Sequence, residues 1–331
     1  MGTKEMAGMS NVEPHPEETR CGGRTAVAVE PVRELQSGVT VALGGPRGMI
    51  VTRTLPNRNR RMVGAWCFAD FYGPADLTSA PGMRVPPHPH TGLQTVSWLV
   101  SGEVLHRDSL GNCQVIEPGQ LNLMTAGRAI AHSEETPAEH SAVLHGVQLW
   151  TALPDRSRHI APQFAHHPDL PVLRETGVTV TVIMGELGDA ASPAQIFSPL
   201  VGAEAVLADD AAIRLPLNPD WEYAALVLSG RIEVDGLALS AGPLLYLGSG
   251  RSDLGLRSDE PGRVLLIGGE PFDEQIVMWW NFIGRDHDEI VAAREDWMSG
   301  QRFGAVRGYA GDPLPAPPMP TTRLKPRGRQ P

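Results

Sequence analysis

Short runs in which apolar and polar residues alternate make up most of the chain between residues 26 and 311. Examples are "QTVSWLVSGEVLHRD" (94–108), "SAVLHGVQLWTALP" (141–154) and "GVTVTVIMGEL" (177–187). A period of two is typical of β-strands, and glycine or proline separates the runs roughly every 8 to 12 residues, as in sandwiches and barrels of short strands. The pattern therefore predicts an all-β protein built from antiparallel strands.

Two stretches repeat the same order of features. Residues 95–127 and 223–250 both read as strand, Ser-Gly turn, strand, turn, strand, proline or glycine-proline, strand. Such a repeat predicts two copies of one domain in tandem. Where the first copy has "HPH" (88–90), we place "NPDWEYAAL" (218–226) of the second, which offers Trp221, Glu222 and Tyr223 and no histidine. We therefore expect one chemical site per chain, in the first copy.

The ends of the chain lack this pattern. We predict a disordered tail over 1–25, an N-terminal domain over 26–165, a C-terminal domain over 166–311 and a Pro-rich tail over 312–331. Neither tail has the apolar residues that offset the entropy of ordering. One helix is predicted near 286–299, because Asp286 can cap its first turn and Gly300 can end it. We expect Trp279-Trp280, just before it, to be packing residues.

Composition narrows the classes of function. The net charge of −10 disfavours direct binding to nucleic acid, because such proteins present a basic surface to phosphates. Cys21, Cys67 and Cys113 share no CxxC spacing, so neither a disulfide framework nor a thiolate zinc site is indicated. The sequence shows no apolar run of the roughly 18 residues that a membrane span needs and no signal-peptide core. We expect a cytoplasmic protein that contacts no membrane.

Four side chains that can bind a metal fall at i, i+2 spacing on two predicted strands. They are His88 and His90 of "HPH", and His132 and Glu134 of "HSE". Alternate residues of a strand share a face, so two strands of one barrel would bring three imidazoles and one carboxylate together. A lone pair of strand histidines would be structural, but the second pair favours a metal. Such a set suits Fe(II), Ni(II), Mn(II), Cu(II) or Zn(II) with open positions for substrate or O2.

The longer strings around these residues are similar to the motifs of the pirin family, which belongs to the cupin superfamily. They are "HPHTGLQTVSWLVSGEVLHRDSLGN", "EPGQLNLMTAGRAIAHSE", "FADFYGP" (68–74), "LHGVQLWTALP" (144–154) and "WWNFIGRDHDEI" (279–290). The resemblance covers about residues 26–311. It implies two tandem antiparallel cupin (jelly-roll) β-barrels with a C-terminal helix. It also implies one metal per chain, most often Fe(II), held in the N-terminal barrel by His88, His90, His132 and Glu134.

One position departs from the wider cupin pattern. Many cupins have a glutamate ligand four residues after the second histidine of HxH, and this chain has Gln94 there. In pirins the glutamate of HxE takes this place, so Gln94 weakens the general cupin interpretation and not the pirin one. Glu135 is an alternative carboxylate, but the alternation of a strand would direct it to the opposite face.

Two functions remain open on this resemblance. Several bacterial pirins resemble flavonol dioxygenases of the quercetinase type, which open the central ring of the substrate with O2 and release carbon monoxide. Glu134 would then be both ligand and catalytic base, and the partners would be a small aromatic substrate and O2. Pirins of higher organisms instead resemble redox-responsive regulators that act through a protein partner. A purely structural metal is disfavoured, because structural zinc prefers sites with thiolates.

The sequence also suggests places for other histidines, a cysteine and several apolar residues. We expect His106 to bond Asp108 or lie at the surface, His145 to orient a ligand or substrate, and Cys113 to be a surface thiol. Residues 154–172 are polar and irregular and form the expected linker between the domains, and its three histidines should be solvated: His159, His166 and His167. Six apolar residues are candidates to exclude water from the site and stack on a flat substrate: Phe68, Phe71, Val96, Trp98, Met124 and Leu149.

Overall fold

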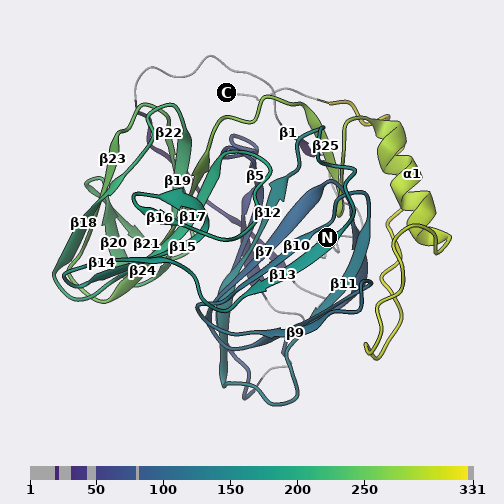
Figure 1. Cartoon of the computed structure of the whole chain (residues 1–331), viewed down its shortest axis with the longest axis horizontal. Coiled ribbons are helices and arrows are strands. Elements are labelled where there is room, and N and C mark those ends of the chain that lie inside the picture. The colour runs from purple at the N-terminus through teal and green to yellow at the C-terminus, as the bar shows by residue number, and fades with distance from the viewer. Residues whose placement is uncertain (1–18, 22–30, 43–49, 80–81, 327–331) are drawn as a thin grey trace, which may run out of the picture.

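The computed structural model describes residues 19–21, 31–42, 50–79 and 82–326 and shows two β-domains side by side (Figure 1). Each domain has one large and one small antiparallel sheet, the two layers of a jelly roll. In the described residues the sheets of a domain share no ladder that would close them into one continuous barrel. The prediction of an all-β chain with two tandem domains is confirmed.

The first domain holds a seven-stranded and a four-stranded sheet. The large sheet has the order β13 (Gln163–His167), β10 (Leu121–Thr125), β7 (Leu93–Ser101), β12 (Val143–Ala152), β5 (Trp66–Asp76), β4 (Ile50–Leu55), β3 (Val39–Ala42). The small sheet has the order β6 (Arg84–His90), β11 (Ile130–Glu135), β8 (Val104–Asp108), β9 (Cys113–Ile116).

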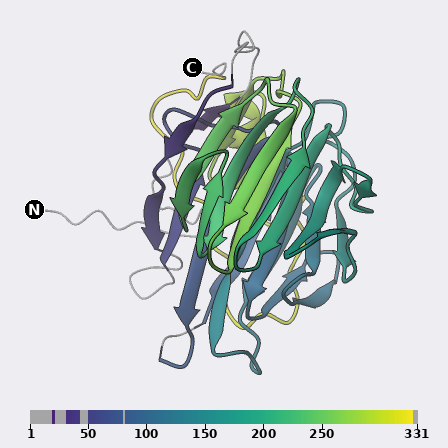
Figure 2. The ribbon, with the colours of Figure 1, turned by 90° about the vertical axis from the view of Figure 1, so that its left-hand side faces the viewer.

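The second domain repeats this topology strand for strand. Its large sheet runs β14 (Val172–Glu175), β15 (Val178–Leu187), β17 (Leu200–Leu207), β24 (Gly262–Gly269), β19 (Glu222–Ser229), β22 (Leu244–Gly248), β2 (Glu34–Gln36), and β16 (Ala190–Ala191) also pairs with β15. The small sheet runs β18 (Ala211–Pro216), β23 (Asp253–Ser258), β20 (Arg231–Val234), β21 (Leu237–Ser240). Figure 2 looks onto this domain. The two sheets therefore confirm the internal repeat.

The chain crosses between the domains more often than the expected boundaries allow. β2 lies within the expected N-terminal domain (26–165) but pairs with β22 of the second domain, and β13 spans the expected boundary at residue 165 to pair with β10. Both strands occupy edge positions of their sheets, because a jelly-roll edge accepts any extended segment that supplies hydrogen bonds.

The C-terminal part of the chain returns to the first domain. β25 (Ile276–Trp279) and β26 (Phe282–Gly284) pair with β1 (Thr19–Cys21), so the predicted disordered tail contains a strand; the rest of 1–25 lies outside the described residues. Helix α1 (His287–Met298) follows, with the Asp286 carboxylate accepting from the Glu289 N–H as predicted. It packs beside β26 in a cluster that includes Trp279 and Trp280, which confirms their packing role.

The Pro-rich segment after the helix is irregular in structure yet packed. Ala316 and Leu324 are buried in the same cluster as α1, and the Leu314 N–H donates to the Pro87 carbonyl of β6 (2.8 Å). Trp297 of the helix donates from its indole N–H to the Leu314 carbonyl (2.8 Å). The expectation that this tail cannot bury enough apolar surface to be ordered differs from the structure, because a few spaced apolar residues pack against the apolar residues of α1, β25 and β26.

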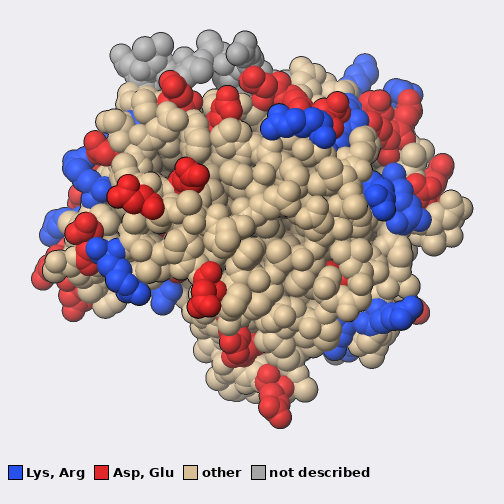
Figure 3. Space-filling view, in the orientation of Figure 1, with Lys and Arg blue, Asp and Glu red and all other residues tan. Residues whose placement is uncertain are grey.

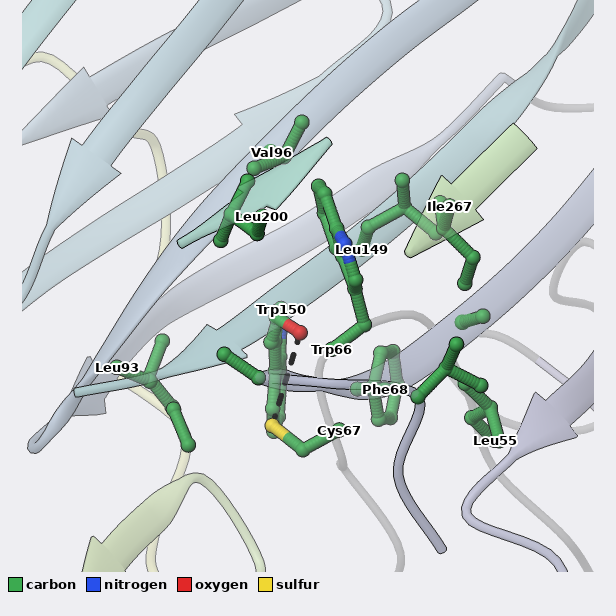
Figure 4. Packing of buried hydrophobic residues seen from close by; sticks show 14 of the residues in the cluster. Leu55, Trp66, Cys67, Phe68, Leu93, Val96, Leu149, Trp150, Leu200 and Ile267 are labelled. Carbon is green, nitrogen blue, oxygen red and sulfur yellow. Dashed lines mark hydrogen bonds between the residues drawn. The ribbon is translucent and has the colours of Figure 1, made fainter. Parts of the chain in front are cut away.

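An apolar cluster between the two large sheets holds the domains together. Val96 and Leu149 of the first domain lie against Leu200 and Ile267 of the second (Figure 4). The indole N–H of Trp66 also donates to the Val201 and Gly268 carbonyls, both at 3.1 Å. The large sheet of the first domain is therefore buried on both faces, one against its own small sheet and one against the second domain.

Polar contacts at this interface surround one buried carboxylate. Glu222 is 1% exposed; it accepts from the Gly64 N–H of the first domain and from the Tyr246 hydroxyl, each at 2.7 Å.

In Figure 3 charged side chains of both signs lie mainly toward the rim of the face that is shown. No helix in the described part of the chain is both long and apolar enough to span a membrane.

Candidate metal centre

A β-bulge in β6 aims the first two histidines into the domain. His132 of β11 pairs with His88 and Glu134 pairs with Val85, so Ser133 alone lies opposite Pro86 and Pro87. Proline has no N–H to contribute to a ladder, so the bulge falls where no donor is lost. The extra residue shifts the alternation of β6, and Val85, His88 and His90 can all face inward.

His88, His90 and His132 converge as predicted. One ring nitrogen of each lies within 4.8 Å of the others, and all three side chains are fully buried. Nε2 of His90 is 3.0 Å from Nε2 of His132. At this distance one neutral ring can donate to the other, and two metal bonds of about 2.0–2.1 Å from one ion span the same gap when both nitrogens present lone pairs. The residues therefore fit a transition metal, and no other such group occurs among the described residues.

Burial keeps these imidazoles neutral, which is the form that binds a metal. It lowers the pKa of His88 to about 4 and the pKa of His90 and His132 well below the ordinary value, and repulsion among the rings adds to this. A neutral imidazole offers one lone pair, and the hydrogen bond of its other nitrogen decides which one.

Two of the rings are held by such hydrogen bonds. His88 Nδ1 donates to the Pro86 carbonyl of the bulge (2.8 Å), which leaves Nε2 for a metal. His132 Nδ1 is 3.3 Å from Nδ1 of His106, and His106 Nε2 is 3.2 Å from the Asp108 carboxylate. If His106 donates to Asp108, its Nδ1 can accept from His132, and His132 Nε2 is left for the metal.

Only one of the two contacts of His106 was expected from the sequence. Of the two alternatives expected for His106, the structure shows the bond to Asp108 and not a surface position, and its link to His132 was not foreseen. The link follows from the register of β8 on β11, which pairs His106 with Glu134 and Asp108 with His132. His106 also stacks on Phe164 with ring centroids 4.5 Å apart, which fixes its plane.

Glu134 lies on the predicted face but is not part of the three-histidine group. Its Oε1 accepts from the Ser97 hydroxyl (3.3 Å), while Oε2 is buried and has no hydrogen-bond partner. Burial is the main cause that raises the pKa of this carboxyl from 4.5 to about 7. The side chain is therefore a buried acid poised near neutrality, and its role as a fourth ligand stays a prediction.

Two of the residues discussed in the sequence analysis lie away from the metal centre, at the interface with the second domain. Although His145 was expected to orient a ligand, its ring meets Phe71 edge-on at 5.4 Å, and the backbone of Leu228 and the charge of Arg263 in the second domain affect its pKa. Gln94 also faces the second domain, donating to the Thr125 hydroxyl (2.9 Å) and to the Gln195 carbonyl (3.1 Å).

The three histidines expected to be solvated differ in their exposure. His159 is exposed as predicted, but His166 and His167 lie in β13, and His166 donates from Nδ1 to Asn122 Oδ1 (2.7 Å). Both are only partly exposed, because β13 completes the large sheet. Cys113 is exposed, as predicted.

Only two of the six apolar candidates face the interior of the first domain. Phe68 stacks on Trp150 at 4.0 Å, and Trp150 meets His90 edge-on at 5.1 Å. Met124 pairs with Phe164, the residue that stacks on His106. The other four lie on the face toward the second domain: Phe71, Val96, Trp98 and Leu149. Trp150 and Phe164 are the aromatic residues near the centre that the sequence analysis missed.

The second domain has an apolar interior in place of this centre. By strand order its counterpart to β6 is β18 and its counterpart to β11 is β23, so the alignment of Trp221, Glu222 and Tyr223 with HPH is one strand off. Leu215, Leu254 and Leu256 are buried in those two strands. The described part of this domain thus offers a packed core and no ligand set at the matching place.

Comparisons with known proteins agree with the geometry. The family model described as Pirin matches residues 48–151, and that of the Pirin C-terminal cupin domain matches residues 202–304. The chain is 50% identical to a Pseudomonas aeruginosa protein named "Putative quercetin 2,3-dioxygenase", over 84% of this chain and 88% of the other. It is 38% identical to a pirin-like protein of Caulobacter vibrioides, over 76% and 88%.

A solved structure is similar to this chain over both domains. The crystal structure of a quercetin 2,3-dioxygenase from Acinetobacter baumannii has 41% identical residues and a TM-score of 0.84, over 88% of this chain and 98% of that one. The resemblance therefore covers both domains.

Proposed function

The chain belongs to the pirin family, and on that premise we propose that it is a metal-dependent dioxygenase that opens the ring of a flavonol such as quercetin with O2. The observation that carries this proposal is the convergence of three neutral, buried imidazoles beside a carboxyl with a raised pKa. The name of the Pseudomonas relative and the similarity to the Acinetobacter quercetin 2,3-dioxygenase support the reaction class.

In this proposal His88, His90 and His132 hold one divalent metal ion, with Fe(II) as the expected native ion and Ni, Mn, Cu or Zn as alternatives. A bound metal would polarise the substrate oxygen and provide an open position for O2. The imidazoles suit this task because burial keeps them neutral and Pro86 and His106 fix two of their rings. Glu134 is the fourth ligand of the proposal.

Glu134 is also the proposed base. Burial raises the pKa of this carboxyl to about 7 in the metal-free protein, and a carboxylate beside the metal could take the proton of an enolic hydroxyl and return it later. The Ser97 hydroxyl at 3.3 Å orients the carboxyl, and the unpartnered Oε2 is the atom available to the proton. Phe68 and Trp150 contribute an aromatic wall that excludes water beside His90.

The test begins with elemental analysis of the purified protein. We expect one transition metal per chain, lost in the His88→Ala variant. The loaded protein is then mixed anaerobically with quercetin and O2 is admitted, while the flavonol absorbance is followed. Loss of the flavonol band only after O2 is the expected result. A fully loaded protein that leaves flavonols unchanged would favour the regulatory function in its place.

A further inference from the structure

A row of polar side chains crosses the inner face of the large sheet of the first domain. Strand register makes each member the direct neighbour of the next across five strand pairs. In order the row is His166, Asn122, Ser97, Gln148, Asp70 and Arg53. Directly paired residues of a sheet point to the same side. Ser97 bonds Glu134 of the opposite small sheet, so the row faces the candidate metal centre.

The two ends of the row are satisfied within the protein. At one end Asp70 accepts two hydrogen bonds from Arg53, at 2.8 and 2.9 Å. At the other end His166 donates to Asn122 Oδ1. The end residues therefore need no ligand to satisfy their hydrogen bonds. The residues in the middle of the row differ.

The middle of the row has polar atoms that lack partners. Asn122 is 3% exposed and its Nδ2 makes no hydrogen bond; Gln148 is 2% exposed and its Oε1 accepts none. The Oε2 atom of Glu134 across the interior is a third. Buried polar groups of native proteins are paired with protein, water or ligand, because an unpaired one is costly. A donor and two acceptors thus face one interior.

A second row flanks the first and is mainly apolar. Two residues along each strand, on the same face, the register gives Phe164, Met124, Thr95, Trp150 and Phe68. The interior wall therefore has an aromatic and aliphatic band beside a hydrogen-bonding band. A flat ring system with oxygen substituents along one edge fits such a wall, since its faces need apolar contact and its edge needs partners.

We propose that Asn122 and Gln148 form a substrate-recognition row that binds the additional ring hydroxyl groups of a planar polyhydroxylated aromatic compound. This inference rests on the proposed function and specifies its substrate class. Asn122 Nδ2 donates to a substrate oxygen, and Gln148 Oε1 accepts from a substrate hydroxyl. Binding satisfies both amides, and it also selects against flat compounds that lack these substituents.

The test uses zinc-loaded protein, in which binding is measured without redox turnover. Dissociation constants of quercetin and of 3-hydroxyflavone, which lacks the additional hydroxyls, are determined by absorbance titration. The variants are Gln148→Met and Asn122→Leu, which keep side-chain volume and remove the amide. The matched control is Gln94→Met, because Gln94 is a buried amide on neighbouring β7 that bonds Gln195 toward the second domain.

We expect each row variant to weaken quercetin binding about tenfold, the order of one buried hydrogen bond, and to change 3-hydroxyflavone binding less than about twofold. The control should leave both constants within about twofold. Equal weakening of both ligands, or unchanged quercetin binding, would overturn the inference, and having two row variants covers the failure of one to fold.

Failure of this inference differs from failure of the proposed function. If the iron-loaded wild type consumes quercetin and the row variants bind it normally, only the recognition row is wrong. If the row variants behave as expected and the iron-loaded wild type consumes no O2, only the dioxygenase activity is wrong. A wild-type protein that binds neither flavonol overturns both.

Discussion

Replacing His106 by leucine removes the partner of a metal-binding ring without touching the three-histidine group. His106 is 4% exposed and lies between His132 and Asp108, at 3.3 and 3.2 Å. In the His106→Leu variant the Nδ1–H of His132 has no acceptor, and the ring can turn or change tautomer. Nε2 is then no longer preset toward the other two imidazoles.

The expected loss of zinc affinity follows from these two hydrogen bonds. Leaving one buried donor unpaired costs about 1–3 kcal/mol, and loss of a group that orients a metal-binding histidine typically costs about 10–100-fold in metal affinity. We therefore expect the dissociation constant for Zn(II) to rise about 10–100-fold. His106→Gln should recover much of the loss, because its amide oxygen can accept from His132 and its amide N–H can donate to Asp108.

Competition with a chelator of known affinity measures the constant, and thermal unfolding of the metal-free proteins measures stability. The matched control is His145→Leu, since His145 is 5% exposed in the same domain but contacts Phe71 and the second domain. Its zinc affinity should stay within about twofold. Wild-type zinc affinity in a folded His106→Leu protein, or equal losses in both leucine variants, would refute the reasoning.

Three further predictions concern the acid, the pH and the interface. Glu134→Gln should retain appreciable metal and lose flavonol turnover by about 10²–10⁴-fold, whereas the loss in His88→Ala should be largely recovered by excess metal; wild-type turnover by loaded Glu134→Gln would disprove the catalytic role. In metal-free protein the Glu134 pKa, raised from 4.5 to about 7, means that the native state keeps a proton that the unfolded state releases, so this group lowers stability as pH rises through that window. The histidines act in the opposite sense, because their native pKa values are lowered, so urea unfolding of wild type is compared with that of Glu134→Gln, in which the histidines are unchanged. The free energy of unfolding of the variant should rise relative to that of wild type by up to about 3 kcal/mol between pH 4.5 and 7. A difference that stays constant with pH would contradict this. Glu222→Ala should lower the free energy of unfolding by about 2–3 kcal/mol, because it leaves the Gly64 N–H and the Tyr246 hydroxyl without this acceptor; a change below about 0.5 kcal/mol in urea unfolding would show that the interface does not depend on it.

Strand periodicity predicted part of the histidine triad. The period of two, which holds locally whatever the tertiary structure, placed His88 and His90 on one face of a strand. Their convergence with His132 also required two strands of one barrel, and the pairing of β6 with β11 provides it. The contact between His106 and His132 depends on the register of β8 against β11, and register is set by long-range packing. The pattern "HRD" was the available signal, because it places His106 and Asp108 on one face of a strand next to the HxE strand.

The substrate wall could not be assigned by the usual rule that apolar residues face the core. β7 is buried on both faces: Val96 and Trp98 face the second domain, while Thr95 and Ser97 face the interior that holds the candidate site. The apolar face of this strand packs against the second domain, and its polar face lines the interior that holds the candidate site. One sequence without knowledge of the domain interface could not tell these faces apart.

Carbon monoxide release is the measurement that tests the central claim most directly. Iron-loaded wild-type protein, mixed with quercetin under argon and then exposed to O2, should release about one molecule of carbon monoxide for each flavonol consumed, and the His132→Ala protein should release none. Iron-loaded wild type that leaves the flavonol intact and releases no carbon monoxide would contradict the account.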